Sequence, residues 1–136
     1  MASTLKKGPL RVSITESYTL NGRENTIQNS SIHENIREVG SRIVSCPDSA
    51  TTNLIQTGVA AGYGVYITED IRYVRITNLD DENAVTVSMT GDITASLPLE
   101  AGGTISMTLS LSGVTTFQVV NASGFSVDVE VFVASV

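Results

Sequence analysis

The 136-residue sequence has no tryptophan, one cysteine and one histidine, and only 5% of its residues are aromatic. The lone Cys46 excludes an internal disulfide and a thiolate zinc site, and we expect it to be a small buried apolar residue. A histidine-based triad needs a nucleophile on a strained turn, but no Gly-x-Ser-x-Gly motif accompanies His33, which we expect at the surface. The scarcity of aromatic residues also argues against a sugar-binding groove. We therefore expect a non-enzymatic protein with no catalytic residue, metal ligand or cofactor.

Charged residues are scarce, and basic residues are absent from the second part of the chain. They make up 16% of the sequence, against about 25% in a typical globular protein. No lysine or arginine follows Arg75, whereas residues 76–136 contain seven acidic side chains. Because an acidic surface repels phosphate, we expect no contact with nucleic acid. Few charges keep such a surface apart from other proteins, which favours a subunit of a homo-oligomer.

The sequence also lacks long apolar runs. No segment reaches the roughly 18 apolar residues of a membrane span. Lys6 and Lys7 are not followed by the apolar stretch of a secretory signal, so we expect no membrane association and no secretion. Residues 1–9 are small, polar and basic and end in a Gly-Pro pair, which predicts a flexible N-terminal arm. Residues 10–136 have the size of a single domain.

What the sequence does contain is a series of short segments in which apolar and polar residues alternate. The predicted strands cover residues 10–15, 26–32, 37–46, 51–57, 71–79, 84–90, 93–97, 104–111, 117–121 and 126–133. Such segments, recurring about every 8–12 residues between glycine or asparagine turns, are typical of a β-sandwich or barrel. We predict an all-β fold, an antiparallel β-sandwich of jelly-roll type. The first strand is expected to be half-buried, and the last to hold the C-terminus in a sheet.

Three local features give more specific predictions. Asn21-Gly22 predicts a tight type I′ turn, because both positions tolerate positive φ. The two strands around the acidic segment 80–83 are predicted to pair as a β-hairpin, with Arg72, Val74 and Ile76 on one face of the first. Residues 31–44 are the only segment with helical spacing of apolar residues, but Gly40 interrupts it. We expect at most one helical turn there, followed by a strand from about residue 37.

Candidate contact residues lie near the N-terminus and in the middle of the chain. Lys6 and Lys7 could form a strap between subunits, and Arg72 and Arg75 are the last basic side chains in the sequence. Tyr63 and Tyr66 lie in and beside a glycine-rich loop, and tyrosine is enriched at interfaces. That loop lacks the Gly-x-Gly-x-x-Gly and P-loop spacings of a nucleotide site. The segment from Asp80 to Asn83 has oxygen ligands for weak calcium binding but not the spacing of a calcium loop.

The lack of edge protection also favours a subunit of an oligomer. The strands after residue 76 have scattered carboxylates and rows of serine and threonine but no lysine, the residue with which isolated sandwiches often guard their edges. Some edges are therefore expected to be covered by another subunit.

Five segments of the sequence are similar to one group of known proteins. They are residues 12–17 with 20–22, the strand 42–44, residues 73–83, the turn 97–102 and the end 129–134. Through these segments the chain resembles small structural proteins of tailed bacteriophages, especially marine and cyanobacterial phages. The resemblance implies a β-sandwich component of the virion, most often a head decoration or cement protein at this size. It implies no catalytic residue.

On this basis the predicted function is a capsid decoration or cement protein that bridges capsid subunits. Its expected partners are the major capsid protein or another virion protein, together with further copies of itself, a trimer being our expectation. Its expected location is the virion, assembled in the host cytoplasm. The alternatives are a tail or neck adaptor, a fibre-base subunit, or a carbohydrate- or calcium-binding module.

Overall fold

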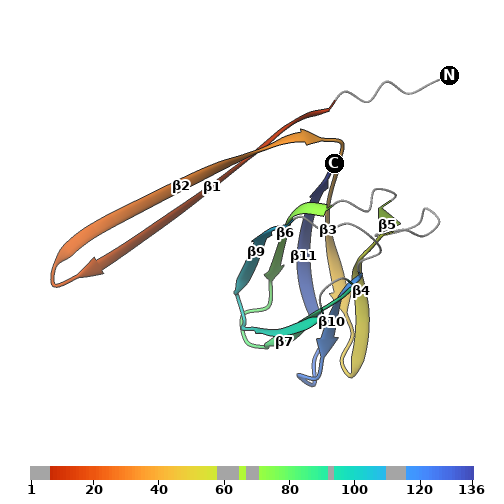
Figure 1. Cartoon of the computed structure of the whole chain (residues 1–136). Helices are drawn as coiled ribbons and strands as arrows, with labels where there is room; N and C mark the ends of the chain where they lie inside the picture. The colour runs from red at the N-terminus through yellow and green to blue at the C-terminus, as the bar shows by residue number, and fades with distance from the viewer. Residues whose placement is uncertain (1–6, 58–64, 67–70, 92–93, 110–115) are drawn as a thin grey trace. The chain divides into compact units, whose positions relative to one another are not determined.

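The computed structural model describes residues 7–57, 65–66, 71–91, 94–109 and 116–136 (Figure 1). These residues form strands, turns and bends, with no helix among them. The chain divides into two compact units, Met1–Arg37 and Glu38–Val136. The first unit contains β1 (Gly8–Leu20) and β2 (Arg23–Ile36). The strands of the second unit are β3 (Glu38–Cys46), β4 (Ala50–Thr57), β5 (Val65–Tyr66), β6 (Ile71–Asn78), β7 (Val85–Thr90), β8 (Ala95–Leu99), β9 (Thr104–Thr108), β10 (Thr116–Asn121) and β11 (Val127–Ser135).

The second unit is a sandwich of two antiparallel sheets. One sheet has the order β3-β11-β6-β9 and the other β4-β10-β7-β8, with the two-residue β5 added in parallel to the edge of β4. If β5 is set aside and the remaining strands of this unit are numbered in chain order, the sheets read 1-8-3-6 and 2-7-4-5. This alternation between two sheets is the jelly-roll arrangement. The predicted fold is therefore confirmed, including the C-terminal strand, which lies inside a sheet between β3 and β6.

The predicted hairpin around residues 80–83 is wrong. Strand β6 pairs with β11 and β9, whereas β7 pairs with β10 and β8, so the two strands belong to different sheets. The segment between them crosses from one sheet to the other. The physical reason is the core: Val74 and Ile76 of β6 and Val85 and Val87 of β7 are all buried in one cluster. Two apolar faces can cover each other across a sandwich, which they could not do within one sheet.

Two β-bulges adjust which side chains face the core. At the first, Phe117 pairs with Ile55 but Gln118 pairs with Asn53, so the extra residue Leu54 is buried beside Ile55. This is the two-against-one pairing of a bulge. At the second, Ser135 of β11 pairs with Ile71 rather than Arg72.

The second bulge corrects the predicted alternation of β6. Ile71 is fully buried together with Val74 and Ile76, while Arg72 is half-buried. The prediction that grouped Arg72 with Val74 and Ile76 therefore fails at the start of this strand. Alternation alone cannot reveal a bulge, because the extra residue changes the face of every residue before it.

One edge of the sandwich is guarded by proline. Strand β8 is the outer strand of its sheet, and it includes Pro98, opposite Thr86 of β7. The sequence placed this proline in a turn, but the strand continues to Leu99. Proline has no N–H to offer to a further strand, so it limits pairing at this edge.

The first unit is a long two-stranded hairpin. Its register runs from Leu20 opposite Arg23 to Leu10 opposite His33, and the turn residues Asn21 and Gly22 have φ values of 53° and 75°. The predicted turn is therefore confirmed. The strands are longer than predicted, at 13 and 14 residues. Asparagine and serine interrupt the alternation of the second strand, but most residues of β2 are exposed, and exposed strand positions tolerate polar residues on both faces.

Candidate functional site

The two faces of the β1–β2 hairpin differ sharply in composition. Residues opposite each other in an antiparallel pair share a face, and alternate residues change face. The register therefore gathers six apolar side chains on one side, which we call the hairpin face: Leu10, Val12, Ile14, Tyr18, Leu20 and Ile27. The opposite face of this fully described hairpin is lined mainly by serine, threonine and glutamine, and Ile32 is its one large apolar residue. The hairpin is thus amphipathic.

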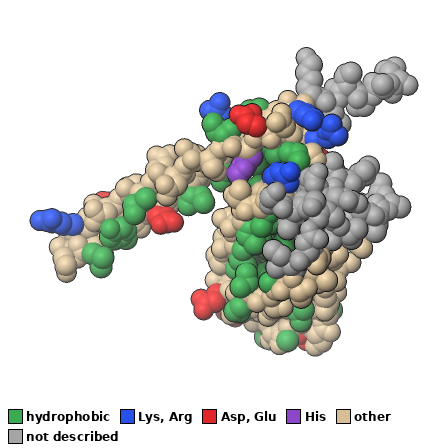
Figure 2. All heavy atoms as spheres, viewed as in Figure 1, with side chains coloured by type: hydrophobic (Ala, Val, Ile, Leu, Met, Phe, Trp, Pro, Cys, Tyr) green, Lys and Arg blue, Asp and Glu red, His purple; other side chains and the backbone are tan. Residues whose placement is uncertain are grey.

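The hairpin face is open to solvent. The exposed fractions rise from 44% at Ile14 to 63% at Leu20, whereas Leu10 and Val12 are half-buried. The predicted half-buried strand over residues 10–15 is therefore confirmed at Leu10 and Val12 but is wrong at Ile14. Figure 2 shows hydrophobic side chains spaced along the hairpin. At about 3.3 Å per residue, 13 residues extend for about 40 Å. A two-stranded hairpin is marginally stable alone, and exposed apolar faces are found at protein interaction sites. The hairpin face is therefore a candidate interaction surface.

A second exposed apolar area lies on the outer side of sheet β3-β11-β6-β9. The ladder places Val39 and Ile43 of β3 on the same side as Phe132 of β11. We call these three residues the outer-sheet patch. Val39 and Ile43 are more than half exposed and Phe132 is half-buried.

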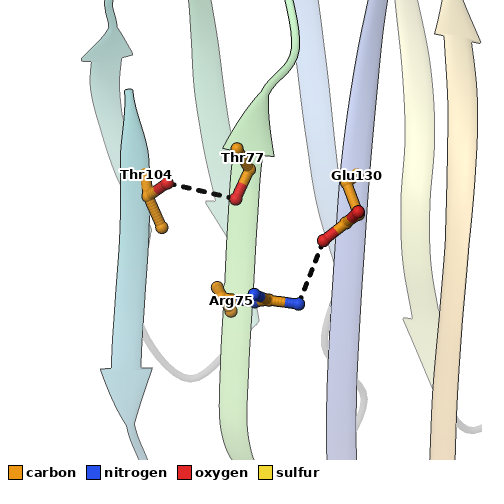
Figure 3. Close-up of polar contacts among 4 residues, drawn as sticks. All are labelled: Arg75, Thr77, Thr104 and Glu130. Atoms are coloured by element: carbon orange, nitrogen blue, oxygen red, sulfur yellow. Dashed lines mark hydrogen bonds and ion pairs between the residues drawn. The ribbon is translucent and has the colours of Figure 1, made fainter. Parts of the chain in front are cut away.

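Polar cross-strand contacts border the outer-sheet patch (Figure 3). Arg75 Nη2 donates to Glu130 Oε1 over 3.0 Å, and the Arg75 guanidinium carbon lies 5.8 Å from the centre of the Phe132 ring. The hydroxyl oxygens of Thr77 and Thr104 are 3.1 Å apart. Exposed pairs of this kind contribute about 1 kcal/mol or less to stability, but they hold neighbouring side chains in place. Arg75 is therefore engaged within its own sheet.

Of the other predicted contact residues, Lys7, Tyr66 and Arg72 lie in the described part of the chain, at different elements. Lys7 is exposed just before β1, and Arg72 is half-buried at the bulge of β6. Tyr66 lies in β5, but its side chain is outside the description, as are Lys6 and Tyr63 as a whole. The interaction role assigned to these residues stays a prediction. His33, expected at the surface, is half-buried in β2, with its Nε2 3.3 Å from Ser31 Oγ.

The crossover from β6 to β7 is built around the buried Asn78. Its Nδ2 donates to the carbonyl oxygens of Asn83 (2.8 Å), Glu100 (3.2 Å) and Leu99 (3.4 Å), and its Oδ1 accepts from the N–H of Asp80 (3.0 Å). One side chain thus ties the 79–84 crossover to the turn after β8. A buried amide is tolerated because its polar atoms are paired.

Asn121 has the same role at the end of β10. It is fully buried and donates to the carbonyl oxygens of Cys46 and Phe125, while its Oδ1 accepts from the N–H and hydroxyl of Ser123. It therefore connects the turn after β3 with the turn before β11. Buried, fully paired amides of this kind specify one arrangement of the loops.

The carboxylate of Asp80 caps the crossover through one of its two oxygens. Asp80 Oδ1 accepts from the N–H groups of Glu82 (2.8 Å) and Asn83 (2.7 Å) and from Asn83 Nδ2 (3.1 Å). These donors, the Glu82 N–H first, lower the pKa of Asp80 below its ordinary value. Calcium binding by this segment stays untested. Among the described residues, no three His, Cys, Asp or Glu side chains form a group that could hold a metal ion.

Asp80→Asn is expected to lower the thermal stability at neutral pH, because an amide oxygen accepts these hydrogen bonds less strongly than a carboxylate. A group whose pKa is lowered by folding stabilises the fold above its unfolded pKa of about 3.9, and this contribution disappears as the pH falls through the folded pKa. The Tm difference between wild type and variant should therefore vanish in acid. Thermal unfolding across a pH series measures it. Asp81→Asn, at an exposed neighbour, is the control, and an equal effect of both variants would contradict the capping role.

Burial makes the thiol of Cys46 unreactive. Its side chain is fully buried in the core, as predicted, and burial, the largest influence, raises the pKa of its thiol. A buried thiol with a raised pKa is a poor nucleophile. Cys46 is therefore a packing residue.

A shallow hollow of about 230 Å³ lies on the other sheet, where Thr86, Pro98, Val120 and Ser123 are among its lining residues. Its lining contains no ionisable side chain. It therefore provides no acid, base or metal ligand.

Sequence reasoning missed the hairpin face and the outer-sheet patch. A signal for the first was present, since the alternation of Leu10, Val12 and Ile14 continues at Tyr18 and Leu20. Alternation marks an apolar face but does not tell whether the same chain covers it. Ile43 was assigned to a strand, yet its exposure follows from which side of the sheet faces the core.

No helix among the described residues is long and apolar enough to cross a membrane. No protein-family model matches the sequence, and no curated protein matches it.

Proposed function

We propose that this chain is a non-enzymatic structural protein of a virion, a head decoration or cement protein that bridges capsid subunits. The observation that carries the proposal is the long hairpin with one exposed apolar face, a shape suited to lying on another protein. Jelly-roll sandwiches are frequent in viral capsid proteins, which agrees with the resemblance of the sequence to phage structural proteins. The jelly-roll fold supports the proposed capsid role but does not carry it, since one fold can have many functions.

The mechanism of such a protein is linkage. A protein that binds the assembled shell and not its dissociated subunits raises the stability of the shell by mass action. In this mechanism the apolar face of the hairpin makes the intermolecular contact, either on a capsid subunit or between the copies of an oligomer that binds the capsid. No bond-making chemistry is required.

The test is binding to heads of the phage that encodes the chain, prepared from a mutant lacking this gene. We expect the purified protein to sediment with these heads and to raise the temperature at which they lose DNA. Ile27→Glu, on the hairpin face, should weaken binding at least about tenfold, which is 1.4 kcal/mol. Ile32→Glu, on the opposite face of the same strand, should leave binding unchanged.

Failure of the wild-type protein to sediment with heads would contradict the proposal.

The number of copies in each particle distinguishes a decoration protein from the nearest alternative, a tail or neck adaptor. A decoration protein is spread over the shell in many copies, whereas a tail or neck adaptor forms one ring in each particle. Counting the copies in purified particles by mass spectrometry therefore distinguishes the two.

A further inference from the structure

We infer that the hairpin face of one copy of this chain packs on the outer-sheet patch of a second copy. The inference rests on the proposed function, since it supplies the oligomer that would bind the capsid. It goes further by naming the partner of the hairpin and the surface on which the hairpin lies.

Apolar complementarity is the first argument. Two sheets pack face to face when each offers apolar side chains, at about 10 Å separation. The outer side of sheet β3-β11-β6-β9 offers Val39, Ile43 and Phe132. The outer side of the other described sheet offers mostly hydroxyl and amide side chains, such as Thr51, Asn53, Thr86, Ser88 and Gln118, with Val120 and Pro98 as exceptions. The outer-sheet patch is therefore the better match for the hairpin face.

Charge is the second argument, and it selects the sandwich of a second copy over its hairpin. Residues 1–37 contain five basic and three acidic side chains, a net charge of +2, whereas residues 38–136 contain three basic and eleven acidic ones, a net charge of −8. Two hairpins would bring like charges together. A hairpin against a sandwich brings opposite charges together, which steers association and selects the partner.

The contact has a consequence for symmetry. Each copy has one hairpin and one outer-sheet patch, so the two surfaces in contact differ. Such a contact closes either by reciprocal exchange in a dimer or by rotation into a ring, of which a trimer is the smallest. A hairpin lying on the sandwich of its own chain would instead leave the protein monomeric.

The experiment compares four single glutamate variants of the full chain by light scattering and sedimentation. Ile27→Glu and Ile43→Glu place a charge on the hairpin face and on the outer-sheet patch. Ile32→Glu and Val120→Glu are matched controls on the opposite face of the hairpin and on the outer side of the other sheet, with exposed fractions of 53% and 39%. All four sites are partly exposed, so each variant should fold, and circular dichroism checks this.

We expect wild type and both controls to form the same oligomer. Ile27→Glu and Ile43→Glu should each weaken association about 100-fold, equal to about 2.8 kcal/mol, because each buries an unpaired charge. Mixing these two variants should restore part of the association, since one supplies an intact patch and the other an intact hairpin. A monomeric wild type would overturn the inference. Loss with Ile27→Glu but not with Ile43→Glu, or no restoration on mixing, would overturn it in favour of another contact.

The same variants separate this inference from the proposed function. An oligomer that forms through the two surfaces but does not bind heads would refute the capsid role and leave the inference intact. A monomer that binds heads through the hairpin face would refute the inference and leave the capsid role intact.

Discussion

Phe117→Ala is expected to lower the free energy of unfolding of the sandwich by about 3–5 kcal/mol. Phe117 is fully buried in β10, which lies between β4 and β7 in its sheet. The substitution removes the ring and leaves a cavity that the surrounding strands fill only in part. With a domain stability of about 5–15 kcal/mol, this loss would unfold a substantial fraction of a marginal protein.

Urea denaturation and thiol labelling measure this effect independently. Cys46 is fully buried, so labelling requires the sandwich to open, and the variant should be labelled faster in proportion to its lost stability when opening is fast and reversible. Phe125→Ala is the matched control, because Phe125 is 66% exposed and its loss should change stability by about 0.5 kcal/mol or less. Equal stability of the two variants would contradict the assignment of Phe117 to the core.

Asn78→Asp is expected to destabilise the sandwich by about 3–5 kcal/mol at neutral pH, the range for an uncompensated buried charge. The two side chains have nearly the same shape, so packing is preserved. The amide nitrogen that donates to the carbonyls of Asn83, Leu99 and Glu100 becomes an oxygen that repels them. The crossover between the two sheets would lose the bonds that hold it.

The destabilisation caused by Asn78→Asp should increase with pH. Burial against carbonyl oxygens raises the pKa of the new carboxyl group above its unfolded value of about 3.9. The penalty is therefore smallest below that value, grows as the pH rises towards the folded pKa, and is constant above it. Thermal unfolding from acid to neutral pH should show the variant approaching wild type in acid. Asn53→Asp, at an exposed position of β4, should behave like wild type throughout, and a variant penalty independent of pH would argue against a buried charge.

The sequence was sufficient for the fold class because alternation reports which face of each strand is buried. It was not sufficient for strand pairing. Residues on either side of the acidic segment 80–83 alternate in the same way whether the strands lie in one sheet or in two, so a hairpin and a crossover look alike. The bulges at Leu54 and Arg72 were also invisible, because a bulge is defined by the partner strand.

The candidate site was harder to predict for a related reason. Tyr18 and Ile27 have the pattern of buried strand residues, yet they are 45% and 47% exposed. A periodic apolar face indicates that a protein surface covers it, but it does not tell whether that surface belongs to the same chain. The prediction of Lys6, Lys7, Tyr63 and Tyr66 as contact residues rests on residue type, which contains no information on the neighbouring surface.

The place of β11 also sets the order in which the molecule is made. This strand is the last in the chain, yet it lies between β3 and β6 and supplies the register for both. During synthesis, β3 and β6 therefore lack this partner until β11 has emerged, and a chain cut short before Val127 would expose the strand edges that β11 covers to aggregation. The β1–β2 hairpin pairs residues close in sequence and can close as soon as it emerges. The sheet β3-β11-β6-β9, in contrast, cannot be completed until β11 has emerged.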